Sequence, residues 1–222
     1  MDQALISVLV LVFSVVVHEC AHGWTALLLG DDTARQAGRL TLNPVPHIDL
    51  LGSLVLPAVM ALAGAGIFGW AKPVPVDTRR LRDPRNDHPK VAAAGPASNL
   101  LLALAFAILL GVGLAWLRTS GDGGRSADFP LFLVKLAAAG VQVNVILALF
   151  NLIPLPPLDG SWILRRFLPP HLLAPYENLR RYGFLPLIGV ILLLNFTPLS
   201  GVLYLVIARY EAVAVFVRNL LS

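Results

Sequence analysis

A short pattern near the start of the sequence contains three side chains that could act together, His18, Glu19 and His22. Residues four apart on an α-helix lie on one face. The two histidines can therefore offer nitrogens to one metal ion at about 2.0–2.1 Å, which suits zinc. Glu19 cannot share the ligand direction, but it can reach a water held on the metal. This H-E-x-x-H arrangement, with glutamate as general base, predicts metal-assisted hydrolysis.

The surroundings of this pattern make it more specific, because it lies inside an apolar stretch. An ionisable group near the centre of a transmembrane helix costs at least about 2.5–3.5 kcal/mol, and such groups usually mark function. The alternative is that His18 and His22 are neutral core histidines bonded to neighbouring helices, with Glu19 protonated. Three such groups in five residues need a compensating ion or cavity, so we favour the metal site.

A catalytic zinc typically takes three protein ligands and keeps one position for water. Most other acids fall in predicted loops, chain ends or interfacial positions, but Asp159 follows an apolar run and is embedded in NLIPLPPLDG, residues 151–160. Prolines break regular helix, and Gly160 permits a tight turn. This stretch can therefore aim Asp159 sideways toward a metal. The alternative is a proline-rich helix end with a solvated aspartate.

The composition indicates an integral membrane protein with a single domain over residues 1–222. Of the 222 residues, 57% are hydrophobic and 14% are charged, whereas roughly one-quarter of the residues in soluble domains are charged. A membrane-spanning helix needs about 20 apolar residues. The candidate spans are 4–29, 50–69, 91–117, 131–153 and 184–208.

Charge sets the expected orientation in the lipid bilayer. The loop 72–90 holds six basic residues and is predicted to be cytoplasmic by the positive-inside rule, with 165–181 on the same side. The net charge of +4 follows from such loops and predicts no nucleic-acid partner. The segment 50–69 either spans, which makes the N-terminus cytoplasmic, or is re-entrant, so that the first helix runs from outside to inside. That first helix lacks the features of a removable signal peptide, and we expect it to be retained.

Three motifs in order along the chain are more specific than any one of them. His18-Glu19-x-x-His22 on the first apolar helix, GPASN at 95–99 opening the third, and NLIPLPPLDG at 151–160 closing the fourth together resemble the site-2 protease family of intramembrane zinc metalloproteases. The stretches GRLTLNPVPHIDLLGS and FGWAKPVPV are also similar to those of its short bacterial and archaeal members.

The resemblance implies one zinc ion per chain, held by His18, His22 and Asp159, with Glu19 as base and Asn151 helping to position the substrate or the oxyanion. It implies membrane protein substrates and a prokaryotic plasma membrane. It further implies a small membrane-associated β-hairpin between the first and third helices. The chain resembles the short form, without a PDZ-like insertion or a CBS-like domain.

Several other residues have a structural and a functional interpretation. The alternating KPVPV at 72–76 is a candidate edge strand for pairing with an extended substrate, or an extended loop. Asn99 either lies near the site or links helices, and we favour the second role. His47 is predicted to be a loop residue and Cys20 a packing residue. Four tryptophans near span ends are expected to lie at the membrane interface: Trp24, Trp70, Trp116 and Trp162.

The predicted fold is an all-α polytopic membrane protein, a bundle of about five to six transmembrane or re-entrant helices with a small β-hairpin. The predicted function is an intramembrane zinc endopeptidase that cuts within or near transmembrane segments. Two alternatives use the same residues: a metal-binding membrane transporter and a non-catalytic relative that binds membrane helices. The sequence does not predict the substrate, the cleavage position, the trigger or the oligomeric state.

Overall fold

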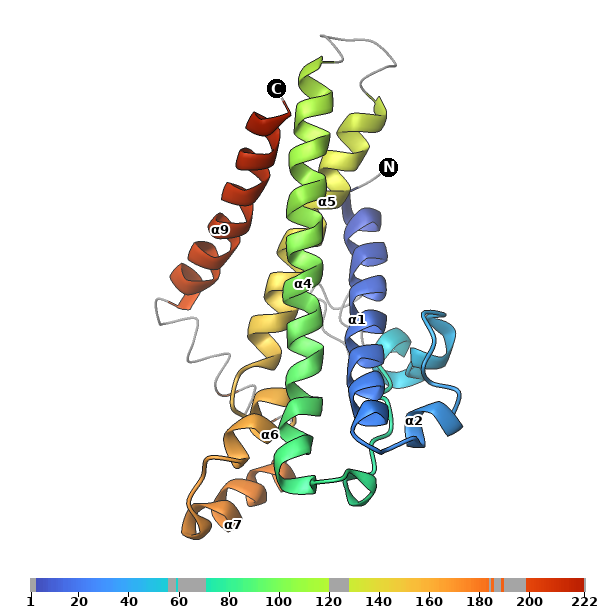
Figure 1. Ribbon diagram of the computed structural model, residues 1–222, viewed down its shortest axis with the longest axis vertical. Coiled ribbons are helices and arrows are strands. Elements are labelled where there is room, and N and C mark those ends of the chain that lie inside the picture. Colours follow the sequence, from blue (N-terminus) through green and yellow to red (C-terminus); the bar gives the residue numbers. More distant parts are fainter. Residues whose placement is uncertain are drawn as a thin grey trace.

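The computed structural model describes residues 3–55, 59, 71–119, 128–183, 185, 189 and 199–221. All regular structure in these ranges is helical (Figure 1). In chain order the elements are α1 (Gln3–Leu28), α2 (Thr33–Gln36), η1 (Val45–His47), η2 (Leu50–Val55), η3 (Thr78–Arg80), α4 (Pro84–Thr119), α5 (Asp128–Asn151), α6 (Asp159–Arg165), α7 (Pro170–Asn178), η5 (Leu179–Tyr182) and α9 (Leu199–Leu220).

Among the described helices, α1, α4 and α5 are long and apolar enough to cross a membrane. They match the predicted spans 4–29, 91–117 and 131–153, and the chain is a membrane protein. The predicted span 50–69 lies largely outside the described residues. Of 184–208, the described part is mainly the beginning of α9, which runs beside α4 (Figure 1).

Helix α4 occupies the centre of the bundle, in contact with α1, α5 and α9 (Figure 1). Small side chains let these helices approach closely, as is usual between helices in membranes. Ala103 and Ala107 of α4 are fully buried against Val145 of α5, and residues of α9 cover the same cluster. A Cβ atom at Gly140 of α5 would lie 2.2 Å from the ring of Phe106. Alanine and glycine at these contacts are therefore as important for close helix packing as the larger side chains.

The start of α4 differs from the sequence-based expectation. We expected the GPASN motif to open this helix, with Pro96 in its first turn, but α4 begins at Pro84 and contains Pro89 and Pro96 in its interior. The Asp83 carboxylate accepts a hydrogen bond from the Asn86 backbone N–H at 3.2 Å, which satisfies one of the unpaired donors of the first turn. The motif is therefore a mid-helix element.

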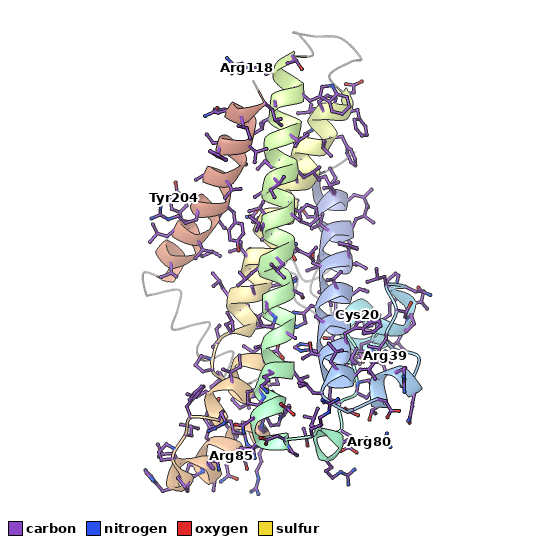
Figure 2. All side chains as sticks on the ribbon, in the orientation of Figure 1. Cys20, Arg39, Arg80, Arg85, Arg118 and Tyr204 are labelled. Carbon is purple, nitrogen blue, oxygen red and sulfur yellow. The ribbon has the colours of Figure 1, made fainter. Side chains whose placement is uncertain are left out.

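Both basic loops lie at one end of the bundle, as predicted. Arg80 and Arg85 are at this end and Arg118 is at the other (Figure 2). The Arg166 side chain donates from Nε to Asn86 Oδ1 at 2.7 Å and so connects the second basic loop to the first. This end is called the basic end below.

The two flanks of the segment 50–69 meet beside α1, near Glu19, which accepts a hydrogen bond from the Val74 backbone N–H. The Lys72 backbone N–H donates to the His47 carbonyl at 2.9 Å. Further out, the Arg82 backbone N–H donates to the Leu29 carbonyl at 3.0 Å. The chain therefore leaves the end of α1 and returns beside it before α4 begins.

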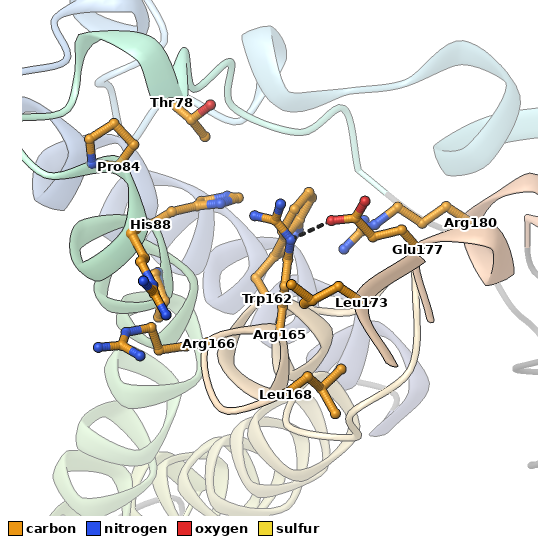
Figure 3. Close-up of a pocket in the computed structure, with 12 residues that line it drawn as sticks. Thr78, Pro84, His88, Trp162, Arg165, Arg166, Leu168, Leu173, Glu177 and Arg180 are labelled. Carbon is orange, nitrogen blue, oxygen red and sulfur yellow. Dashed lines mark hydrogen bonds and ion pairs between the residues drawn. The ribbon is translucent and has the colours of Figure 1, made fainter. Parts of the chain in front are cut away.

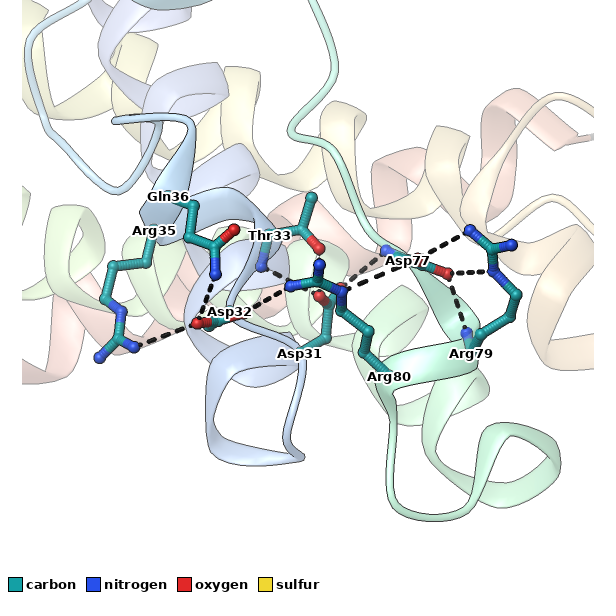
Figure 4. Close-up of polar contacts among 8 residues, drawn as sticks. All are labelled: Asp31, Asp32, Thr33, Arg35, Gln36, Asp77, Arg79 and Arg80. Atoms are coloured by element: carbon teal, nitrogen blue, oxygen red, sulfur yellow. Dashed lines mark hydrogen bonds and ion pairs between the residues drawn. The ribbon is translucent and has the colours of Figure 1, made fainter.

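A polar cluster fixes this return (Figure 4). Asp31 is fully buried directly after α1, and it accepts hydrogen bonds from the Thr33 backbone N–H at 3.0 Å and the Asp77 backbone N–H at 2.7 Å. Arg80 Nη1 lies 2.8 Å from Asp32 Oδ1. The contacts join the turn around α2 to the turn around η3.

The predicted β-hairpin is not found in the described part of the chain, which has no strand. The segment 72–76 is irregular, as the loop alternative predicts. Its prolines, Pro73 and Pro75, have no N–H, and the Lys72 and Val74 N–H groups donate to the His47 carbonyl and to Glu19. Contacts with the protein itself therefore occupy two of the three backbone N–H donors of this segment.

Candidate metal centre

The structure brings His18, His22 and Asp159 together, although Asp159 is far along the chain from both histidines. The two histidine Nε2 atoms are 3.0 Å apart. Asp159 Oδ2 lies 3.2 Å from His18 Nε2 and 3.3 Å from His22 Nε2. A tetrahedral zinc ion with bonds of about 2.0–2.1 Å would hold its ligand atoms about 3.3–3.4 Å apart. The spacing of the three atoms fits a zinc site.

The position of Asp159 depends on how the chain leaves α5. Helix α5 ends at Asn151, Leu158 is extended with φ −72° and ψ 159°, and Asp159 is the first residue of α6. Gly160 does not make the predicted tight turn, because its φ is not positive. A Cβ atom there would lie 2.3 Å from the Leu152 carbonyl oxygen. Glycine is needed because the backbones approach closely.

A chain of buried amides fixes the tautomer of His18. Asn144 Nδ2 donates to the Gly140 carbonyl at 2.9 Å, so Asn144 Oδ1 is an acceptor, and Asn99 Nδ2 donates to it at 2.9 Å. Asn99 Oδ1 must then face His18 Nδ1, at 2.6 Å. Because an amide oxygen only accepts, Nδ1 carries the hydrogen and Nε2 presents a lone pair.

His22 is fixed in the same tautomer by the backbone of α4. Its Nδ1 lies 2.7 Å from the Val91 carbonyl oxygen, which only accepts, so its Nε2 also presents a lone pair. Asp159 Oδ2 is buried and has no hydrogen-bond donor. Three acceptors therefore converge, and a single proton can bridge only one pair of them. A cation compensates all three, so the residues fit a metal ion.

Gly95 supplies the space beside the two imidazoles. A Cβ atom at this position would lie 2.4 Å from His22 Nε2 and 2.6 Å from His18 Cε1. Any other residue would push its side chain into the volume that the ligand atoms face. The first glycine of GPASN is therefore part of the site's shape, which sequence reasoning did not identify.

Glu19 is held beside the centre but does not belong to the three-residue cluster. Its side chain is half-buried, and Oε2 accepts a hydrogen bond from the Val74 backbone N–H at 2.7 Å. The irregular segment 72–76 therefore passes next to Glu19. This contact orients the carboxylate through a residue 55 positions away.

The other predicted residues lie outside the cluster. Asn151 is half-buried at the end of α5, and its Nδ2 donates to the Leu147 carbonyl of the same helix at 2.9 Å. His47 ends the short η1 in the connection between α2 and α4; it is buried, and its Nε2 lies 3.0 Å from the Thr41 carbonyl oxygen. The Cys20 thiol donates to the same carbonyl at 3.1 Å and is buried, as a packing residue would be.

One residue near the site was assigned incompletely, and two were missed. We favoured a purely helix-linking role for Asn99, but it both links helices and orients His18. Asn144 and Ser14 were missed, although Asn144 Nδ2 donates to Ser14 Oγ at 2.9 Å. Signals for both were available: Asn144 interrupts an apolar run, and Ser14 lies four residues before His18 on the same helix face.

Comparison with known proteins agrees with this geometry. The sequence profile of peptidase family M50 matches residues 124–194, which include Asn151 and Asp159. YwhC of Bacillus subtilis is 40% identical over 194 residues, which are 87% of this chain and 81% of that protein. Rip2 of Mycolicibacterium smegmatis is 33% identical over 187 residues, 83% of this chain and 64% of Rip2.

Both relatives carry the description "putative zinc metalloprotease". No solved structure matches the chain significantly. The identity to YwhC extends over most of both sequences, so the relationship concerns the whole helical unit and not one motif. This chain belongs to peptidase family M50, the site-2 protease family of zinc metalloproteases.

Proposed function

We propose that this protein is an intramembrane zinc endopeptidase that hydrolyses peptide bonds within or near transmembrane segments of membrane proteins. One observation carries the proposal: His18 Nε2, His22 Nε2 and Asp159 Oδ2 converge as three acceptors without a donor. Because family members are described as zinc metalloproteases, zinc is the cation that we assign, one per chain.

His18, His22 and Asp159 would hold this zinc. When bound, zinc acts as a Lewis acid that polarises the scissile carbonyl and lowers the pKa of a water. Asn99 and the Val91 carbonyl keep the two Nε2 lone pairs directed at the ion through their hydrogen bonds to Nδ1. Such partners fix the tautomer and the orientation of a ligating histidine.

Glu19 is the proposed general base and acid. Its carboxylate takes the proton of the attacking water and then gives it to the amine that leaves. The hydrogen bond from the Val74 N–H to Oε2 holds the carboxylate in one orientation. Asn151 is proposed as a positioning residue: one N–H of its amide donates to the Leu147 carbonyl, and the other would donate to the substrate carbonyl oxygen.

The location of the site supports a substrate inside the membrane. The imidazoles belong to a helix long and apolar enough to span, and their side chains are only 9% and 11% exposed. We assign the basic end to the cytoplasm of a prokaryotic cell, which gives α1 an outside-to-inside direction because α1 ends there, where the Leu29 carbonyl accepts a hydrogen bond from the Arg82 N–H. We further propose that residues 1–222 act as one domain.

The decisive experiment compares Glu19→Gln with the wild type in proteoliposomes that contain a co-reconstituted transmembrane substrate. The glutamine cannot accept the proton, so cleavage should fall by about 10²–10⁴-fold, the range for general acid–base catalysis, while zinc content stays at one per chain. Glu211→Gln is the matched control, because Glu211 is an exposed acid on α9 and lies outside the three-residue cluster, and it should cleave normally.

Full cleavage by Glu19→Gln would overturn the role of Glu19. Zinc flux across the proteoliposome membrane without any cleavage by the wild type would identify a transporter instead. Purified wild type without zinc, even after addition of zinc, would identify a non-catalytic relative.

A further inference from the structure

A cavity of about 690 Å³ lies at the basic end, between the first turns of α4, the helix α6 and the segment from α7 to η5 (Figure 3). Four arginines line it: Arg85, Arg165, Arg166 and Arg180. The one acid in the lining is Glu177. The cavity is distinct from the metal centre, since none of the three converging side chains lines it.

Only one of the four guanidinium groups forms an ion pair within the described residues. Arg165 Nε lies 2.6 Å from Glu177 Oε1, as the dashed line in Figure 3 marks. Arg166 and Arg180 instead donate to neutral acceptors, Asn86 Oδ1 and Ser161 Oγ. Positive charge in the cavity therefore exceeds negative charge.

The Arg180 guanidinium group is held in place by an aromatic ring. Its guanidinium carbon lies 3.5 Å from the centre of the Trp162 ring, a stacked cation–π contact. Burial lowers the pKa of Arg180, and the neighbouring Arg165 charge lowers it further. An anion bound here would relieve both the burial cost and the repulsion between the two guanidinium groups.

The residue types identify the anion as a phosphate. The planar guanidinium group presents paired N–H donors that match two phosphate oxygens, and it is the usual choice for such recognition. The rest of the lining includes two apolar side chains, Leu168 and Leu173, and Phe167 beside them is 75% exposed. A phosphate attached to an apolar body suits this combination.

The position along α4 favours a lipid as the source of the phosphate. The 36 residues of α4 span about 54 Å at 1.5 Å each, whereas the hydrocarbon core of a bilayer is about 30 Å thick. The cavity is lined by the first two turns of α4, including Arg85 and His88, which therefore extend into the headgroup region. Trp162, predicted as an interfacial anchor, lines the cavity at the same level.

We propose that the cavity at the basic end binds the phosphate of an anionic phospholipid headgroup. Arg85, Arg166 and Arg180 bind the phosphate oxygens, and Leu168 and Leu173 contact the upper part of the lipid. The binding site is independent of zinc and of proteolysis, so it stands or fails separately from the proposed function.

The test is calorimetric titration of the full chain in detergent with dihexanoyl phosphatidylglycerol, with dihexanoyl phosphatidylcholine as the uncharged-headgroup arm. We expect the anionic lipid to bind at least tenfold more tightly. Inorganic phosphate and ATP form the soluble arms and should bind more weakly than the anionic lipid. Removal of zinc with a chelator should leave the affinity unchanged.

The matched variants are Arg85→Gln and Arg118→Gln, which remove one exposed arginine from opposite ends of α4 (Figure 2). Arg85→Gln should weaken binding of the anionic lipid by about fivefold, the effect of one basic residue near a membrane surface. Arg118→Gln should have no effect. Arg180→Lys keeps the charge but removes the planar donors, and it should also weaken binding.

Equal affinity for the two lipids would overturn the proposal, as would equal losses in Arg85→Gln and Arg118→Gln. Binding of inorganic phosphate or ATP as tight as that of the anionic lipid would overturn the assignment to lipid. Unchanged affinity in both Arg85→Gln and Arg180→Lys would show that the anion binds elsewhere.

Discussion

Asp31 and Asp159 each bury a carboxylate oxygen, but the surroundings of the two side chains are opposite. Asp31, fully buried at the end of α1, accepts hydrogen bonds from the Thr33 and Asp77 backbone N–H groups and from the Thr33 hydroxyl (Figure 4). Asp159, at the start of α6, directs a buried oxygen at two histidine lone pairs and has no donor. The chain itself completes the first site and leaves the second incomplete.

The difference separates a structural acid from a proposed metal ligand. Burying a carboxylate is costly unless hydrogen bonds or a cation compensate it. At Asp31 the donors come from two turns, one around α2 and one around η3. The hydrogen bonds that compensate the buried charge therefore also hold these turns together. At Asp159 the neighbours are themselves acceptors, so the compensation must come from outside the chain. Both residues are aspartates, so the sequence alone does not distinguish the two roles.

The largest expected effect comes from making the same substitution at both acids. Asp159→Ala should lose stoichiometric zinc, because it removes one of three ligands; its affinity should fall by more than the roughly 10–100-fold that loss of an outer partner costs. Asp31→Ala should keep zinc but lower the free energy of unfolding by about 1–3 kcal/mol for each buried donor left unpaired. Elemental analysis and denaturant unfolding measure the two outcomes.

Asp31→Asn is the milder variant if Asp31→Ala does not fold. Equal zinc content in Asp159→Ala and the wild type would break the comparison, since Asp159 would then be another structural acid. Loss of zinc in a folded Asp31 variant would also contradict the comparison, since Asp31 would then be needed for the metal site.

The next-largest effect tests whether the two histidine rings need the space that Gly95 leaves beside them. Gly95→Ala places a methyl group where His22 Nε2 would be 2.4 Å away, so at least one ring must move. We expect zinc affinity to fall sharply with little change in helix content by circular dichroism. Gly201→Ala on α9 is the control, because a Cβ atom there meets nothing within 4 Å. Normal zinc binding by Gly95→Ala would show that the rings have room to move.

The parts of the site that the sequence predicted are those where chemistry restricts the residues. His18 and His22 must be four apart to bind one ion from one helix face, and few other acids than Asp159 follow an apolar run. The three long spans were predicted for a similar reason, because the bilayer sets their length.

The parts that failed depend on contacts between distant segments. The sequence of 72–76 alternates like an edge strand, yet the segment is irregular and two of its N–H groups donate to His47 and Glu19. Pro96 suits a first turn, yet α4 starts at Pro84. The contact of Lys72 with His47, which brings two distant segments together, is not encoded in hydropathy.

A smaller loss of zinc affinity is expected from the amide chain behind His18. Asn99→Ala leaves His18 Nδ1 without its acceptor, so the ring can rotate or change tautomer. Zinc affinity should fall by about 10–100-fold, and Asn144→Ala, one step further away, should have a weaker effect. The control is Asn86→Ala, an exposed asparagine on the same helix. Equal affinities in Asn99→Ala and Asn86→Ala would confine Asn99 to packing.

The smallest effect concerns the exposed ion pairs around Asp31, which lie in water and not in the core. Hydrogen bonds from Gln36, and then from Arg35 and Arg80, hold the pKa of Asp32 below its usual value. Such a carboxylate contributes stability above its unfolded-state pKa, and this contribution is lost as the pH falls through the lower, folded-state pKa. Exposed pairs contribute little because solvent screens them.

Arg80→Gln should therefore lower the melting temperature of the zinc-free protein only slightly at pH 7, and the difference from the wild type should disappear at acidic pH. Lys135→Gln, which removes a positive charge far from this cluster, is the control. A large loss of stability in Arg80→Gln at pH 7 would mean that the surface pairs, and not the buried Asp31 contacts, hold the two turns together. The contrast between Asp31 and Asp159 would then no longer rest on burial.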